Sequence, residues 1–131
     1  MNLLLTLLIT LSILFLLFQL YPLFSSYKAQ GKKVPVLEGV VPEALYQKDC
    51  YLLYFWAPQC GMCRGMSSIV DKLMNERDNL GKVDASEHPQ ISRDVGVMGT
   101  PALVIIEKGI VSKVTLGAKS EKAIRQMCST D

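Results

Sequence analysis

An apolar run and a cysteine pair adjoin in the segment Tyr51–Arg64, which has the sequence YLLYFWAPQCGMCR. The residues before Ala57 are all apolar or aromatic, which is typical of a central β-strand covered on both faces. Apolar residues at helical spacing follow the cysteines and predict a helix from Cys60 to about Arg77. We therefore expect the cysteine pair at the point where a buried strand ends and a helix begins.

The position of Cys60 and Cys63 favours thiol–disulfide chemistry. The unpaired amides and the dipole at a helix N-terminus stabilise a thiolate. Cysteines three positions apart on a first helical turn face each other, close enough to form a disulfide. We expect Cys60 to attack a substrate disulfide and Cys63 to resolve the mixed disulfide. Gly61, which lies between them, allows a substrate backbone to approach closely.

A zinc half-site is an alternative interpretation, because C-x-x-C also occurs in zinc knuckles. A complete site needs two further ligands from Cys50, Cys128 and His88, and none of these is paired at ligand spacing. We expect Cys50 and Cys128 to be ordinary buried or terminal thiols, and His88 to be a surface residue at a helix start. No metal site is predicted.

A copper-binding chaperone is a second alternative, because Met62 and Met66 bracket Cys63 with soft sulfur. Methionine on a helix is more often core filler, so this class is not favoured. A third class, a redox-inactive docking module, conflicts with the intact cysteine pair. The prediction is dithiol–disulfide exchange that needs no metal and no organic cofactor.

Short strands and helices alternate through the rest of the chain. The expected elements are a first strand within Val34–Leu37 and Val40-Val41, a helix at Pro42–Lys48, strands at Leu80–Asp84, Ala102–Glu107 and Ile110–Leu116, and helices at Pro89–Asp94 and Lys119–Cys128. This alternation of strands and helices implies an α/β sandwich with a mixed central sheet.

Two motifs together resemble the thioredoxin family. Phe55–Arg64 (FWAPQCGMCR) is similar to the active-site segment of that family, and Gly96–Pro101 (GVMGTP) is similar to its loop ending in a cis-proline. The resemblance covers roughly Val34 to Cys128 and implies a three-layer α/β sandwich. It also implies that Pro101 is cis and packs against the cysteine pair, where it shapes the groove for substrate backbone.

The resemblance further implies an activity and a set of site residues. The activity is thiol–disulfide exchange with protein thiols and disulfides, supported by a redox partner that the sequence does not identify. The catalytic residues are Cys60 and Cys63. The residues expected to bind substrate are Trp56, Gly61, Met62, Thr100 and Pro101.

The chain departs from the family pattern at several positions. Gly61-Met62 replaces a pair that usually contains proline, and Gln59 replaces the common tryptophan before the first cysteine. Tyr54 stands where thioredoxins carry a buried acid, which leaves Lys82 without its partner carboxylate. A helix-kinking proline after the motif is also absent. These departures indicate a specialised thioredoxin-like protein whose redox direction stays open.

The first part of the chain is expected to anchor the protein in a membrane. Residues 2–24 carry no charged side chain and span roughly 34 Å as a helix, which matches a bilayer core of about 30 Å. A cleaved signal peptide is the alternative, but no Lys or Arg precedes the apolar run and Leu23–Tyr27 is a poor cleavage site. We expect an anchor at residues 1–24, a linker at 25–33 and a thioredoxin-like domain at 34–131.

Charge gives the expected orientation and excludes one class of partner. Lys28, Lys32 and Lys33 follow the anchor, so the positive-inside rule places the domain in the cytoplasm. The alternative is a periplasm-facing disulfide reductase for cytochrome or envelope-protein assembly. A net charge of +2 over 131 residues, without a basic helix or stripe, does not indicate nucleic-acid binding. The lipid bilayer is the expected partner of the first helix.

Overall fold

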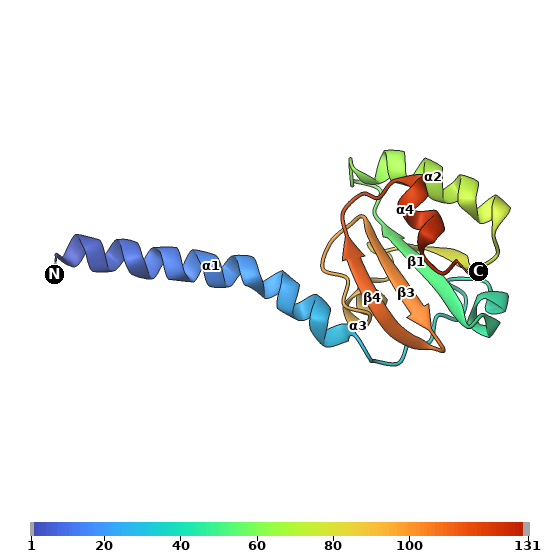
Figure 1. Cartoon of the computed structure of the whole chain (residues 1–131), viewed down its shortest axis with the longest axis horizontal. Coiled ribbons are helices and arrows are strands. Elements are labelled where there is room, and N and C mark those ends of the chain that lie inside the picture. Colours follow the sequence, from blue (N-terminus) through green and yellow to red (C-terminus); the bar gives the residue numbers. More distant parts are fainter. Residues whose placement is uncertain (1, 130–131) are drawn as a thin grey trace.

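The computed structural model describes the backbone of residues 2–129, and their side chains except those of 22, 23 and 25–29. Its sheet contains the strands β1 (Cys50–Trp56), β2 (Leu80–Asp84), β3 (Ala102–Glu107) and β4 (Ile110–Leu116), in the spatial order β2-β1-β3-β4 (Figure 1). β1 pairs in parallel with β2 and antiparallel with β3, which pairs antiparallel with β4. The sheet is therefore mixed, as predicted.

Helices cover both faces of this sheet. α2 (Cys63–Glu76) and α4 (Glu121–Gln126) lie together on one face (Figure 1). The 3-10 helix η1 (Glu43–Gln47) and α3 (Pro89–Asp94) contribute to the apolar cluster on the other face. Each face thus has its own buried cluster, and the expected three-layer α/β sandwich is confirmed.

β1 is the buried central strand that the apolar run predicts. All residues between its two ends are buried. Because side chains alternate along a strand, Leu53 and Phe55 join the cluster beneath η1 and α3, whereas Leu52 and Tyr54 join the cluster beneath α2 and α4. Tyr54 therefore lies under α2, the helix that begins at Cys63.

The first strand expected within residues 34–41 is wrong. These residues, all of which the structure describes, form an extended segment and then a turn that includes Gly39 at a φ of 76°. Pairing with β4 is limited to an isolated bridge between Lys33 and Ile110 and a few neighbouring hydrogen bonds. Pro35 has no N–H to continue a ladder, which explains why the pairing ends there.

The N-terminal helix α1 runs from Leu3 to Ala29 and extends away from the sheet (Figure 1). Its segment Leu3–Tyr21 is long and apolar enough to cross a membrane, and a signal sequence would have the same character. The Thr6 and Thr10 hydroxyls donate to backbone carbonyls one turn earlier, so these groups are satisfied without water. The helix is thus compatible with burial in lipid.

The end of α1 differs from the expected one. The expected anchor ends at residue 24, but the backbone stays helical to Ala29, through Pro22, and takes in part of the expected linker. A proline is compatible with a helix when neighbouring groups satisfy the freed carbonyl. The division into residues 1–24, 25–33 and 34–131 stays a prediction.

Candidate active site

The cysteine pair lies between the end of β1 and the start of α2. The chain turns after Trp56, and the amide of Cys60 donates to the carbonyl of Ala57 at 3.1 Å. The helix begins at Cys63, not at Cys60 as expected, because Cys60 belongs to this turn. Cys60 is therefore placed just before the first helical turn, where helix amides have no intrahelical acceptor.

The two cysteines form a disulfide with a Cα–Cα distance of 5.2 Å. The Cys63 amide donates a hydrogen bond to Cys60 Sγ at 3.2 Å. Cys63 is buried, with 2% of its surface exposed, whereas Cys60 is half-buried. An amide donor at the more accessible sulfur stabilises a thiolate there, which is what an attacking cysteine requires.

The residues between the cysteines leave the site open. An added Cβ at Gly61 would meet nothing within 4 Å, and Met62 exposes 63% of its surface. Arg64 is exposed, so its charge is screened by solvent and has little effect on the pair. A substrate backbone can approach the disulfide from this side.

The expected cis-proline is confirmed, because the Thr100–Pro101 peptide bond is cis. Pro101 is buried and Thr100 is half-buried. Thr100, Gly99 and Met98 line a cavity of about 220 Å³ together with residues of α3 and its flanks. Met98 exposes 45% of its surface and is not among the residues expected to bind substrate.

Lys82 has a carboxylate partner, so the expectation that it lacks one is wrong. Its Nζ lies 3.0 Å from Asp71 Oδ1 and 4.8 Å from the centroid of the Trp56 ring. The acid comes from α2, which packs beside β2, and not from β1. The half-buried Trp56 is therefore held by a cation–π contact that Asp71 orients.

Tyr54 occupies the buried place beneath the pair. Its hydroxyl donates to the carbonyl of Cys63 at 3.3 Å and lies 3.1 Å from Ser67 Oγ. Burial raises the pKa of Tyr54 above its ordinary value of 10, and the charge of Asp71 adds to this, while the Ser67 hydrogen bond opposes it. The phenol therefore stays protonated at neutral pH and acts as a hydrogen-bond donor.

A helical row of polar side chains explains these contacts. Cys63, Ser67 and Asp71 are spaced by four residues on α2, so they share one face of that helix. This face lies over Tyr54 and Lys82, which are register partners on β1 and β2. The i, i+4, i+8 spacing is the sequence signal that would have identified Ser67 and Asp71.

The expectation that Cys50 and Cys128 are ordinary thiols is also wrong. They form a second disulfide, with a sequence separation of 78. Two of the three candidate further ligands for zinc are thus bonded to each other. His88 is half-buried at the N-terminal cap of α3, close to the surface position expected. Within residues 2–129, no group of three or more His, Cys, Asp or Glu side chains is arranged to hold a metal.

Known proteins of similar sequence belong to one family. The Thioredoxin family model matches residues 33–130. Thioredoxin of Bacillus subtilis is 29% identical over 76 residues, covering 56% of this chain and 73% of that protein. Thioredoxin 1 of Nostoc sp. is 31% identical over 97 residues, covering 72% of this chain and 83% of that protein.

Solved structures agree with this assignment. A mutant thioredoxin from Halobacterium salinarum has a TM-score of 0.58 at 25% identity, covering 66% of this chain and 80% of its own. The thioredoxin of Malassezia sympodialis has a TM-score of 0.54 at 30% identity, covering 62% of this chain and 76% of its own. The family match extends over most of the domain and includes both the cysteine pair and the cis-proline loop. The chain therefore belongs to the thioredoxin family and is a thiol–disulfide oxidoreductase.

Proposed function

We propose that the chain is a membrane-tethered oxidoreductase that exchanges a Cys60–Cys63 dithiol or disulfide with protein substrates. The observation that carries this proposal is the asymmetry of the pair. Cys60 has the more accessible sulfur, and this sulfur accepts a hydrogen bond from the Cys63 amide. Cys63 itself is buried. Cys60 is thus suited to attack and Cys63 to resolve.

The exchange proceeds in two balanced steps. The Cys60 thiolate attacks a substrate disulfide, forms a mixed disulfide and releases one substrate sulfur as a thiolate. The Cys63 thiolate then attacks Cys60 Sγ, closes the Cys60–Cys63 disulfide and releases the second substrate sulfur. Two electrons and two protons pass to the substrate. The reverse sequence oxidises a substrate dithiol, and a partner protein must restore the starting state in either direction.

The proposed substrate surface combines the exposed Gly61 and Met62 with the half-buried Trp56 and Thr100 and the buried Pro101. Gly61 and Met62 belong to this surface, and the loop that contains Thr100 and the cis-proline Pro101 is proposed as its second part. Trp56 completes this set, held by Lys82. The open surface at Gly61 and the exposed Met62 support an extended protein segment as the substrate.

Stoichiometric reduction of a protein disulfide tests the proposed function. The reduced protein, freed of metal by a chelator, should reduce about one equivalent of a disulfide-bonded test protein and end with Cys60 and Cys63 joined. Mass mapping after alkylation identifies the bonded pair. Reduction that requires an added metal, or that leaves Cys60 and Cys63 as free thiols, would contradict the proposal.

The phenol of Tyr54 is expected to position α2 and not to transfer a proton. Tyr54→Phe should change the exchange rate by less than about threefold, because a neutral phenol with a raised pKa is a poor base. The ratio of the two rates should be constant from pH 6 to about pH 9, below the ordinary pKa of tyrosine near 10. Stopped-flow reduction of a model disulfide by the wild type and by Tyr54→Phe measures this ratio. A rate loss that grows across this range, at unchanged stability, would make the phenol catalytic.

A further inference from the structure

The second disulfide joins the start of β1 to the residues that follow α4. Cys50 and Cys128 have a Cα–Cα distance of 5.6 Å, within the usual range for bridged cysteines. Because β1 runs from Cys50 to Trp56, this bond lies at the opposite end of the strand from the Cys60–Cys63 pair. The two ends of β1 are about 20 Å apart, at roughly 3.3 Å per residue. The two pairs are too far apart to exchange within one molecule.

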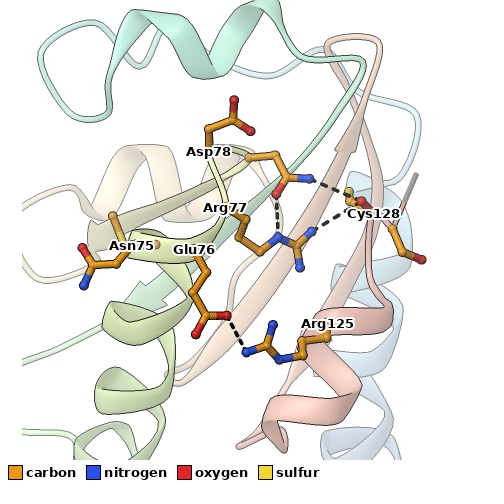
Figure 2. A pocket seen from close by; sticks show the side chains of 9 residues that line it. Asn75, Glu76, Arg77, Asp78, Arg125 and Cys128 are labelled. Atoms are coloured by element: carbon orange, nitrogen blue, oxygen red, sulfur yellow. Dashed lines mark hydrogen bonds and ion pairs between the residues drawn. The ribbon is translucent and has the colours of Figure 1, made fainter. Parts of the chain in front are cut away.

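Arg77 and Asn79 hold the backbone on both sides of this bond. Arg77 Nη2 donates to the carbonyls of Met127 and Cys128, at 3.0 and 3.4 Å. Arg77 Nε donates to Asn79 Oδ1 at 2.7 Å. Asn79 Nδ2 then donates to the carbonyls of Cys50 and Cys128, at 3.4 and 3.3 Å. Figure 2 shows Arg77 directed toward Cys128 across this end of the domain.

These hydrogen bonds fix the cysteines independently of the disulfide. Cys128 has a φ of 50°, in the left-handed region that residues other than glycine seldom adopt. The two bonds to its carbonyl hold it there, and the bond to the Cys50 carbonyl aligns the partner. The fold thus presents the two thiols to each other, as expected for a bond that closes once and stays closed.

The disulfide adds a covalent tie next to helix α4, which is short and buries little of its own surface. It is a helix of 6 residues, too short to be stable alone. Ile124 is its buried residue. Its ion pairs, Lys72 with Glu121 and Arg125 with Glu76, are partly exposed to solvent and therefore screened. The disulfide therefore ties down the end of the chain segment whose Ile124 shares a buried cluster with Tyr54 and α2.

We infer that Cys50–Cys128 is a structural disulfide formed in an oxidising compartment, and that the domain lies on the extracytoplasmic side. The cytosolic thiol pool keeps such pairs reduced, whereas exported proteins retain them. Export agrees with α1 whether that helix is a membrane span or a signal sequence. The lysines at 28, 32 and 33 predict the opposite side, but three charges are a small bias compared with a covalent bond that needs oxidation.

Formation of the bond removes two electrons and two protons from the thiols of Cys50 and Cys128. The oxidant is a disulfide-carrying protein of the compartment. One thiolate of the pair attacks the carrier disulfide, and the other displaces the carrier, which leaves as a dithiol. The inference does not use the roles proposed for Cys60 and Cys63.

Thiol mapping of the full-length protein in intact cells tests the inference. Cells are quenched in acid and alkylated before any reduction, and the peptides that contain Cys50 and Cys128 are identified by mass spectrometry. We expect a bridged, unlabelled peptide pair in nearly all molecules, whatever the state of Cys60 and Cys63. Labelling of Cys50 and Cys128 as free thiols would overturn the inference.

Reporter fusions at the C-terminus of the full chain test the side directly. Alkaline phosphatase requires disulfides, so its fusion in a bacterial host should be active, and a fluorescent-protein fusion that folds in the cytoplasm should be dark. An inactive phosphatase with a bright fluorescent fusion would overturn the extracytoplasmic assignment. That result would leave the proposed exchange activity untouched.

Paired double variants test the structural role in the purified full-length protein. Cys50→Ala/Cys128→Ala should lower Tm by roughly 10–20 °C, because the bond closes a long loop. Its exchange rate should stay within about twofold of that of the wild type. The matched control Cys60→Ala/Cys63→Ala removes a bond of sequence separation 3 and should change Tm much less. An unchanged Tm in the first variant would overturn the structural role. Loss of exchange at an unchanged Tm would do so too, by making the second pair catalytic.

Discussion

Cys60→Ser is expected to lower the rate of disulfide exchange at least about 10³-fold. A serine hydroxyl is not ionised at neutral pH and cannot form a mixed disulfide. Cys63 cannot replace the nucleophile, because only 2% of its surface is exposed and it lies behind Cys60. Stopped-flow reduction of a protein disulfide by the reduced variant measures the loss.

Cys63→Ser is expected to give the complementary result. Cys60 keeps the amide donor at its sulfur, since that donor is the backbone of residue 63 and not its side chain. The first attack should therefore proceed, and mixed disulfides with substrate proteins should accumulate because no thiol resolves them. Gels run without reductant, followed by mass spectrometry of the trapped species, detect these adducts.

The double variant Cys60→Ser/Cys63→Ser is the control for trapping. It should form no adducts, whereas Cys50→Ala/Cys128→Ala should trap no more than the wild type. If Cys60→Ser and Cys63→Ser trapped substrates equally, the assignment of attacking and resolving cysteine would be wrong. Adducts on Cys50 or Cys128 alone would exclude the Cys60–Cys63 pair as the working dithiol.

Local sequence patterns predicted the parts of the fold that depend on short-range order. The apolar run before Trp56 predicted β1, and Leu80–Asp84 was expected with the same bounds as β2. The strands Ala102–Glu107 and Ile110–Leu116 were likewise expected with the bounds of β3 and β4. In each case, burial of a strand on one or both faces requires apolar side chains at fixed positions, and this pattern is visible within a few consecutive residues.

The features that were not predicted join segments far apart in the chain. The Cys50–Cys128 bond spans 78 residues, and neither cysteine lies in a motif. The carboxylate partner of Lys82 is Asp71, which lies on α2. The family pattern places this acid on β1, so it gave no indication of Asp71. The predicted first strand failed for another reason, because apolar residues around Pro35 and Gly39 pack as a turn.

Removal of residues 2–24 is expected to move the protein completely from the membrane to the soluble fraction. The segment Leu3–Tyr21 makes no buried contact with the domain, so its loss removes no core packing. This variant keeps residues 25–131 and so keeps the hydrogen bonds of Gly31, Lys32 and Val34 to the β4 hairpin. It should fold, and its exchange rate should match that of the full chain.

Substitution within α1 separates an apolar span from attachment by charge. Leu11→Arg with Leu14→Arg places two charges near the middle of the span, at about 2.5–3.5 kcal/mol each, and should prevent insertion. The control Leu11→Ile with Leu14→Ile should stay in the membrane through carbonate and high-salt washes. Release of the wild-type protein by salt alone would show that apolar burial does not hold it. A soluble product that begins near residue 26 would identify α1 as a cleaved signal sequence, with the domain exported and not tethered.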